Sequence, residues 1–460
     1  MNRREFLRLA GAASAATLLH LAGGPAACTA SQLPLPTPSV SLARPASPTS
    51  TARPNLILIL ADDLGYAGLG CQGGDLPTPN IDSLTAGGVR AASGYVTCPV
   101  CAPTRAGLLT GRYQQRFGFE TNPGPGDETS GLPLSEKIIP EYLKELGYAT
   151  AMFGKWHLGS SPEQQPTQRG FDEFFGFLGG SHSYLPGERQ TGGPLLRGDT
   201  PVQEAAYLTD ALRGEALSFI DRRQHEPFFL YLAFNAVHTP LQAPDEYMQR
   251  FTHIADEARR THAAMLAALD DAVGAVLNKL AETGLEQDTL VVFLSDNGGP
   301  TAQTTASNAP LRGGKATLYE GGVRVPFLLR WPRRLPAGLV YTQPIASLDL
   351  LPTLLSAAGA ASSAQLDGVD LLPHLSGSQP AAPHDQLYWR MRQQWALRSG
   401  DWKLVQTEGG RRPMLFNLAE DLSEQNDLST QEPARLRTLR SQYQAWADQM
   451  VDSQAKSRKS

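Results

Sequence analysis

The segment CPVCAPTRAGLLTGR, residues 98–112, contains two cysteines, Cys98 and Cys101, separated by two residues. A Cys-x-x-Cys pair can exchange disulfides or contribute to a zinc site. No second such pair and no nearby pair of histidines completes a zinc site here. A redox pair would not require the Pro103 and Arg105 that follow, or the Thr-Gly-Arg ending. The alternative is that only one of the two cysteines does chemistry.

Two pairs of oxygen-bearing residues follow apolar runs and are candidates for metal binding. Asp62 and Asp63 end the run NLILILADD, and Asp296 and Asn297 end the run TLVVFLSDN. Three carboxylates and one amide oxygen suit a hard divalent ion such as Ca²⁺, or alternatively Mg²⁺. Asp and Asn also cap turns and helices, which explains either pair taken alone equally well. Together, the two pairs favour a metal site.

Four cationic or proton-transferring residues lie in similar positions. Lys155 and His157 in GKWHLG are two residues apart, so in extended backbone their side chains point to the same face. His238 lies in NAVHTP, and Lys315 follows two glycines that allow close approach of the backbone to a ligand. Each residue alone has an ordinary explanation, as a hydrogen-bonded histidine or a surface lysine. As a set they could bind an anion and move protons.

Four segments have the composition of buried parallel strands, because each is an apolar run that stops at charged or polar residues. Helix-like stretches lie between them, among them residues 78–89 and 261–284. This alternation predicts an α/β fold in which helices sandwich a large, mostly parallel sheet. Ligands bind at the carboxyl ends of such strands, so the four endings should meet at one edge. The segments are NLILILADD, YATAMFGKWHLG, FFLYLAFNAVHTP and TLVVFLSDNGG.

The pattern changes after Trp331. Residues 348–359 are helix-like, and residues 385–418 alternate aromatic and polar residues around a Gly409-Gly410 turn. This alternation predicts a small antiparallel sheet. Residues 432–454 predict a terminal amphipathic helix. We therefore expect a catalytic α/β domain over residues 54–380 and a smaller C-terminal α+β subdomain over residues 381–460.

The N-terminus has the features of an export signal. Arg3 and Arg4 precede an Ala- and Leu-rich run that ends near Gly24, which predicts a twin-arginine-type signal peptide over residues 1–27. Cys28 could then be lipidated and anchor the protein to a membrane. Residues 28–53 are rich in Pro, Ser and Thr and predict a linker without a core of its own. We expect an exported protein of the periplasm or cell envelope.

Composition limits the partners. The chain of 460 residues has a formal net charge of -5 and no dense basic run, which predicts no nucleic-acid partner. Beyond the signal peptide and Cys28 it has three cysteines, Cys71, Cys98 and Cys101. An odd number argues against a complete disulfide framework.

The stretch CAPTRAGLLTGR, residues 101–112, resembles the signature of formylglycine-dependent sulfatases, Cys-x-Pro-x-Arg followed by Leu-Thr-Gly-Arg. Other blocks match the family in the same order. They are ADD, GKWHLG, RGFDEFFGF, HTP, SDNGG and GGK…EGGVRVP, with SLDLLPTLLSAAG and DWKLV…LFNLAEDLSEQNDL further on. The resemblance implies an alkaline phosphatase-like fold and hydrolysis of a sulfate monoester, of an aryl or carbohydrate alcohol, to alcohol and sulfate.

The resemblance also implies a role for each candidate residue. Cys101 is converted by a separate formylglycine-generating enzyme to Cα-formylglycine, and Cys98 is incidental. The hydrated aldehyde offers two hydroxyl groups on one carbon, one to attack sulfur and one whose proton loss later releases sulfate. Calcium is bound by Asp62, Asp63, Asp296 and Asn297 with an oxygen of the modified Cys101. Arg105 holds the formylglycine and the metal carboxylates, and Lys155, His238 and Lys315 bind the sulfate ester. His157 takes a proton near the diol, while either His238 or Lys315 donates one to the leaving oxygen.

Two other functions stay open from the sequence. The first is a phosphatase or phosphonate-ester hydrolase on the same fold, and the second is a binding protein that kept the fold without the chemistry. Substrate choice should depend on residues 179–202 and on Gln303–Pro310. Tyr184, Arg189 and Arg197 could line a sugar or aryl subsite, or could be solvated loop residues.

Overall fold

The structure is a computed structural model that describes residues 53–124, 127, 130–187, 192–203, 206–361 and 365–453. The predicted signal peptide, Cys28 and almost all of the linker lie outside the described residues. Described residues from Arg53 onward belong to one compact unit. In the described part of the chain, no helix is long and apolar enough to cross a membrane. The predicted boundary between residues 380 and 381 stays a prediction.

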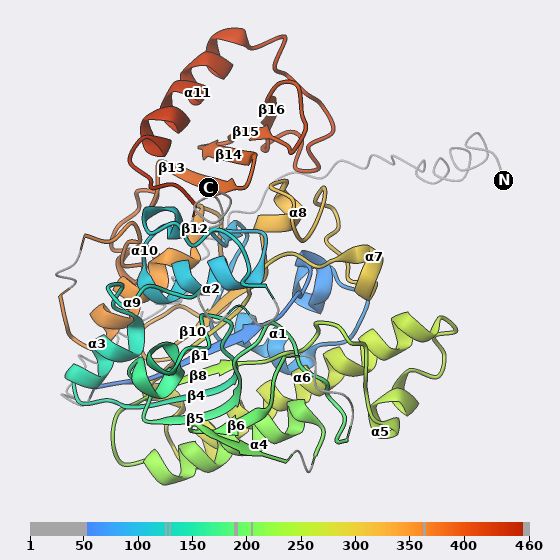
Figure 1. Cartoon of the computed structure of the whole chain (residues 1–460), viewed down its shortest axis with the longest axis vertical. Coiled ribbons are helices and arrows are strands. Elements are labelled where there is room, and N and C mark those ends of the chain that lie inside the picture. Colours follow the sequence, from blue (N-terminus) through green and yellow to red (C-terminus); the bar gives the residue numbers. More distant parts are fainter. Residues whose placement is uncertain are drawn as a thin grey trace, which may run out of the picture. The chain divides into compact units, whose positions relative to one another are not determined.

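A ten-stranded sheet forms the centre of this unit (Figure 1). Its strands follow the order β11-β2-β10-β9-β1-β8-β4-β5-β6-β7. In that order they span Leu339–Tyr341, Val89–Ala91, Phe327–Arg330, Thr289–Ser295, Asn55–Ala61, Phe228–Ala233, Ala149–Lys155, Glu173–Phe177, Leu195–Arg197 and Thr200–Val202. A separate two-stranded pair joins β3 (Gly94–Tyr95) to β12 (Ile345–Ala346).

The four predicted strands are the four neighbours β9, β1, β8 and β4, and all of them pair in parallel. The register aligns Ala61 with Ser295, so Asp62 and Asp296 follow at the same level. Residues of β1, β8 and β9 are buried along their whole length, as expected for strands covered on both faces. The predicted mostly parallel sheet is confirmed, with β10 and the outer strands β6 and β7 antiparallel to their neighbours.

Helices cover both faces of the sheet (Figure 1). Alternate residues of β1 point to opposite faces, since Ile57 and Ile59 belong to one core cluster and Leu56 and Leu58 to the other. The first cluster packs against α1 (Pro79–Ala86), α4 (Leu208–Arg223), α5 (Asp245–Met248) and α6 (Glu257–Glu282). The second packs against α2 (Cys101–Thr110), α3 (Ile139–Glu145), α9 (Leu350–Ala357) and α10 (Leu372–Leu375).

The predicted C-terminal sheet is also confirmed. Strands β13 (Gln386–Met391), β14 (Gln394–Ser399), β15 (Trp402–Gln406) and β16 (Met414–Asn417) form an antiparallel sheet in chain order. The terminal helix α11 (Pro433–Ala447) ends earlier than predicted. Beyond it, Val451 donates to the carbonyl of Gln115 and accepts from Arg390, and these contacts use backbone groups that a continued helix would occupy.

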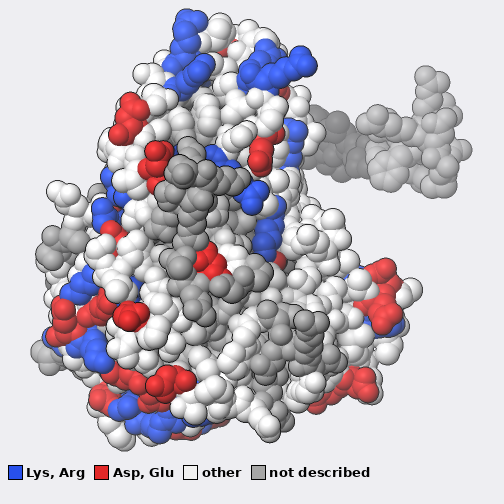
Figure 2. Space-filling model, viewed as in Figure 1, with Lys and Arg blue, Asp and Glu red and all other residues white. Residues whose placement is uncertain are grey.

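Two short helices, α7 (Thr301–Thr304) and α8 (Glu320–Val323), lie between β9 and β10. The segment between them carries Lys315. Basic and acidic side chains lie next to one another on the face that Figure 2 shows. Exposed pairs such as Arg197 with Glu215, at 2.6 Å, neutralise part of this charge. Such surface pairs contribute little to stability.

Candidate active site

The carboxyl ends of the four central strands bring the predicted residues together. Asp62 and Asp63 follow β1, Asp296 and Asn297 follow β9, and Lys155 is the last residue of β4. His157 lies two residues beyond β4, and His238 lies in the loop after β8. Because these strands are parallel neighbours, their ends meet at one edge of the sheet. The predicted convergence is confirmed.

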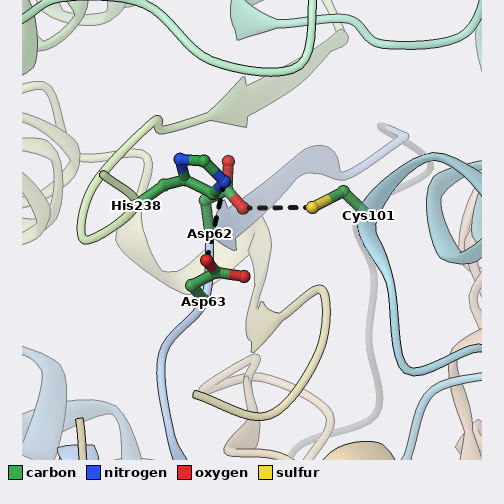
Figure 3. Close-up of side chains that lie close together, drawn as sticks. All are labelled: Asp62, Asp63, Cys101 and His238. Carbon is green, nitrogen blue, oxygen red and sulfur yellow. Dashed lines mark hydrogen bonds and ion pairs between the residues drawn. The ribbon is translucent and has the colours of Figure 1, made fainter. Parts of the chain in front are cut away.

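Cys101 enters this edge from the first turn of α2. Its Sγ lies 3.6 Å from Oδ1 of Asp62, and Figure 3 shows the sulfur directed at that carboxylate. Arg105 lies one helical turn later, on the same side of the helix. The amide N–H of Ala102 donates to Oδ1 of Asn122 at 2.9 Å, which satisfies one of the free donors at the start of α2.

Arg105 joins three of the strand ends. Its guanidinium donates to Oδ2 of Asp296 at 2.7 Å and to the carbonyl of Lys155 at 3.0 Å, and it lies 3.6 Å from Asp62. The Arg105 side chain is fully buried. Burial opposes its charge, but Asp296 and other nearby groups outweigh this and raise the pKa of Arg105. Arg105 therefore stays charged and fixes the spacing of the carboxylates.

Two lysines neutralise the remaining carboxylates. Nζ of Lys155 lies 2.5 Å from Oδ2 of Asp62, and Nζ of Lys315 lies 2.7 Å from Oδ1 of Asp63. Burial opposes ionisation of Asp62, but Lys155, His238 and Arg105 outweigh it and hold the pKa of Asp62 below its ordinary value. Asp62 is therefore ionised, and Arg105, Lys155 and Lys315 each pair with one or two of the three aspartates.

Asn297 leaves one acceptor open. Its Nδ2 donates to Oδ1 of Asp63 at 2.6 Å, whereas its buried Oδ1 has no hydrogen-bond partner among the described residues. The donor atoms of Asp62, Asp63, Cys101 and His238 lie within 4.8 Å of one another. Figure 3 shows the imidazole of His238 near Asp63, at 3.6 Å from Nε2 to Oδ2. His238, predicted to contact substrate, therefore also borders the predicted metal ligands.

The two cysteines are both free thiols. Burial raises the pKa of the Cys101 thiol to about 12, and the neighbouring Lys155 only partly offsets this. Burial also raises the pKa of Cys98. A protonated, buried thiol is a poor nucleophile, so an unmodified Cys101 is inert at neutral pH.

The two histidines differ in environment. Burial, together with Lys155 and Arg105, lowers the pKa of His157 well below its ordinary value, so its imidazole is neutral. Its Nδ1 is buried with no hydrogen-bond partner among the described residues, and its ring packs against Gly180. His238 is held at Nδ1, which lies 2.6 Å from the carbonyl of Thr239. Because a carbonyl only accepts, Nδ1 of His238 carries a proton.

A cavity of about 580 Å³ includes Cys101, His157 and His238 in its lining. Segments of the predicted substrate loop line it as well, including Gly179–Ser181 and Gly192–Pro194. Asn122, Asp127 and Ser160 also line it, and sequence reasoning missed them because no motif marks them. No residue of Gln303–Pro310 lies in the described lining.

Of the three residues considered for a sugar or aryl subsite, Tyr184 and Arg197 do not line this cavity. Tyr184 is fully buried, and its hydroxyl donates to the carbonyls of Asn235 and His238, so it supports the His238 loop. Arg197 is exposed, pairs with Glu215 and stacks on Phe175. Arg189 lies outside the described residues.

Comparison with known proteins decides the family. Residues 54–360 match the family model described as Sulfatase, and residues 314–445 match the model described as N-sulphoglucosamine sulphohydrolase, C-terminal. The chain belongs to the sulfatase family. This sulfatase is 37% identical to arylsulfatase A of Homo sapiens over 384 residues, which cover 76% of this chain and 74% of that protein. It is 36% identical to N-acetylgalactosamine-6-sulfatase of Canis lupus familiaris over 377 residues, 76% of this chain and 71% of that protein.

A solved structure extends the similarity to the fold. Ps i-CgsB in complex with k-i-k-neocarrahexaose is 39% identical to this sulfatase and superposes with a TM-score of 0.83. The match covers 87% of this chain and 94% of that one. The predicted family, fold and reaction class are confirmed, and the protein is a hydrolase of sulfate esters.

Proposed function

We propose that this sulfatase removes sulfate from a carbohydrate ester, with a formylglycine made from Cys101 and a bound Ca²⁺. The cavity beside Cys101 carries this proposal. Its volume, about 580 Å³, is in the range of small-molecule sites. Glycine backbone and small polar side chains line much of it, which suits a hydroxyl-rich sugar ring. The similarity to Ps i-CgsB, which was solved with an oligosaccharide, supports the same substrate class.

The residues present fit a divalent cation. Asp62, Asp63 and Asp296 are buried carboxylates, and Oδ1 of Asn297 is an unpartnered buried acceptor. Ca²⁺ accepts several carboxylates in irregular geometry, whereas Mg²⁺ keeps more of its own waters, so this ligand set favours Ca²⁺. A bound cation would polarise the sulfuryl oxygens and lower the pKa of a coordinated hydroxyl.

Cys101 also fits modification. Its side chain is buried beside Asp62 and also lines the cavity. An aldehyde hydrate at this position would supply a hydroxyl nucleophile, which the protonated thiol does not. Arg105 and Lys155, bonded to one another and to the carboxylates, would hold it in place.

The other site residues bind the ester and move protons. Lys155 and Lys315 supply fixed positive charge for sulfate oxygens. His157 is neutral, so its imidazole accepts a proton near position 101. His238 and Lys315 both contact Asp63 and are the two candidates to protonate the leaving oxygen.

The buried position of Cys101 bears on maturation. Cys101 is only 1% exposed in the folded chain, so a formylglycine-generating enzyme needs access to the segment before it folds. We propose that modification precedes folding in the cytoplasm. The predicted twin-arginine signal would then export the folded protein to the periplasm or cell envelope, where a lipid on Cys28 would anchor it.

One experiment tests these proposals together. The protein is recovered from outside the cytoplasmic membrane of a host that has the maturing enzyme. Its tryptic peptide 91–105 contains both Cys98 and Cys101, so fragment ions must assign the modified position. We expect Cys101 to be about 18 Da lighter than a thiol and Cys98 to be unchanged, as for a thiol converted to an aldehyde nucleophile. The N-terminal peptide shows whether Cys28 carries lipid.

The same sample is assayed for sulfate release from an aryl sulfate and a sulfated galactan oligosaccharide. Chelation should abolish turnover, and Ca²⁺ should restore it better than Mg²⁺. The Cys101→Ala variant is the matched control and should be folded and inactive. Full turnover with an unmodified Cys101 would contradict the formylglycine proposal. Faster cleavage of the matched aryl phosphate would favour the phosphatase alternative, and a modified but inactive protein would favour the binding protein.

A further inference from the structure

Lys315 lies in a loop that is held by contacts with the C-terminal part of the chain as well as with the catalytic sheet. The loop runs from Arg312 to Gly321, and the amide of Gly321 donates to the carbonyl of Arg312 at 2.8 Å, which closes it at its base. Within the loop, Lys315 reaches Oδ1 of Asp63 at 2.7 Å. The position of its ammonium group therefore depends on where the base of the loop is fixed.

Glu424, from the C-terminal segment between β16 and α11, contacts both ends of this loop. Its Oε2 accepts the amide N–H of Glu320 at 2.6 Å. Its main-chain carbonyl accepts from the guanidinium of Arg312 at 2.7 Å. Glu424 is fully buried, so water does not compete for these bonds. One C-terminal residue thus bridges the two ends of the loop.

Lys403 of β15 connects Glu424 to Glu320. Its fully buried Nζ lies 2.8 Å from Oε1 of Glu320 and 3.1 Å from Oε1 of Glu424. Glu320 also accepts from the hydroxyl of Tyr95 at 2.6 Å and from Arg324 at 3.2 Å. Buried ionic groups are costly unless fully paired, and one attested use is to select a single arrangement of the chain.

Gln394 of β14 makes a third contact. Its Nε2 donates to the carbonyl of Ala316 at 3.1 Å, next to Lys315. The amide of Ala316 donates to the carbonyl of Pro99 at 2.8 Å, two residues before Cys101. The C-terminal sheet therefore reaches the residue beside Lys315, and through it the segment that leads into α2.

We infer that Glu424, with Lys403 and Gln394, positions Lys315 for the sulfate ester. The inference rests on the proposed role of Lys315 in binding that ester. The three residues act through the loop and do not contact the cavity, since none of them is part of its lining. The small C-terminal sheet then contributes to the active site indirectly, because it fixes the loop that carries Lys315.

A mutant cycle tests this inference. Glu424→Ala and Lys315→Ala are made singly and together in the matured, Ca²⁺-loaded enzyme, and kcat and KM for an aryl sulfate are measured. Small displacements of a catalytic group are expensive, so we expect Glu424→Ala to lower kcat/KM about tenfold. In the Lys315→Ala background it should have less than a twofold effect. Glu424→Gln keeps an acceptor for the amide of Glu320 and should restore most of the activity.

Two further variants complete the design. If Glu424→Ala does not fold, Gln394→Ala removes only the bond to Ala316 and should lower kcat/KM by about threefold, again only when Lys315 is present. Arg390→Gln is the matched control. It breaks the 2.6 Å pair between Arg390 and Glu120, which also joins the C-terminal sheet to the catalytic region but does not touch the loop. It should leave kcat/KM unchanged.

The outcomes separate the two proposals. If Lys315→Ala leaves turnover intact, the role proposed for Lys315 is wrong. If Lys315→Ala is harmful but Glu424→Ala reduces kcat/KM equally in both backgrounds, only the positioning inference is wrong. An equal loss in Arg390→Gln would likewise overturn it, since any weakening of the sheet would then suffice.

Discussion

The stability of this sulfatase should fall with rising pH because of Glu424. Burial raises the pKa of Glu424 to about 7, with Lys403 partly offsetting this and Glu320 adding to it, against an ordinary value of 4.5. Between these two values the folded chain binds more protons than the unfolded chain. The stabilisation is therefore fully present below pH 4.5 and is lost as pH rises through about 7.

The size of the effect follows from the two pKa values. At about 1.4 kcal/mol per pKa unit, the whole change is about 3 kcal/mol. Linkage places roughly 2 to 3 kcal/mol of it between pH 5 and pH 8. An unfolding entropy of about 2.1 cal/mol/K per residue gives ~0.8 kcal/mol/K for a folded unit of about 400 residues. Ionisation of Glu424 should therefore lower Tm by ~3 °C over this range.

The assay compares the thermal unfolding of the wild type and of Glu424→Gln at several pH values, with equal calcium. The glutamine is neutral throughout, so the titrations of groups that do not interact with Glu424 cancel in the difference between the two Tm values. We expect the wild type to lose ~3 °C relative to the variant between pH 5 and pH 8. Glu408→Gln, at an exposed position in the turn between β15 and β16, should show no such trend. A flat or rising difference for Glu424→Gln would refute the reasoning.

Two further predictions concern residues of the active site. In Gly180→Ala the new Cβ would lie 2.8 Å from Cε1 and Nε2 of His157, so kcat should fall about tenfold or more at unchanged Tm. Gly214→Ala, on the exposed face of α4, is the control, because no atom lies within 4 Å of the new Cβ, and it should keep kcat. An equal loss of kcat in the two glycine variants would exclude the contact with His157 as the cause. Arg105→Met leaves the buried carboxylates Asp62 and Asp296 without their guanidinium partner, so the free energy of unfolding, measured by urea titration, should fall by about 3–5 kcal/mol. A loss below about 1 kcal/mol would show that the lysines alone suffice to neutralise the site.

Much of the site could be predicted because its signals are local. An apolar run that stops at Asp62 or at Asp296 indicates both a buried strand and the polar group at its end. Parallel pairing then brings such ends to one edge, whatever the loops between them do. The same logic placed Lys155 and His238 correctly, although the 3.6 Å approach of His238 to Asp63 depends on a loop conformation with no sequence signal.

The residues whose roles the sequence did not indicate have partners distant in sequence. Asn122 reaches Ala102, Tyr184 reaches the carbonyl of His238, and Glu424 reaches Glu320 across 104 residues. Asn, Tyr and Glu in loops are common in any protein, so their type and spacing carry no information about their partners. Tyr184 and Arg197 were considered for a subsite only because of their place in the loop, and the alternative, a solvated loop residue, holds for Arg197.

The sequence by itself determined which edge of the sheet gathers the polar residues, and that these are carboxylates, an amide, lysines and histidines. These depend on composition and on periodicity over a few residues, which the chain specifies locally. Only the tertiary structure decided which carboxylate meets which cation, what lines the cavity, and that a C-terminal glutamate holds the loop of Lys315. Those contacts are selected by the packing of distant segments, where burial makes an unpaired charge too costly to tolerate.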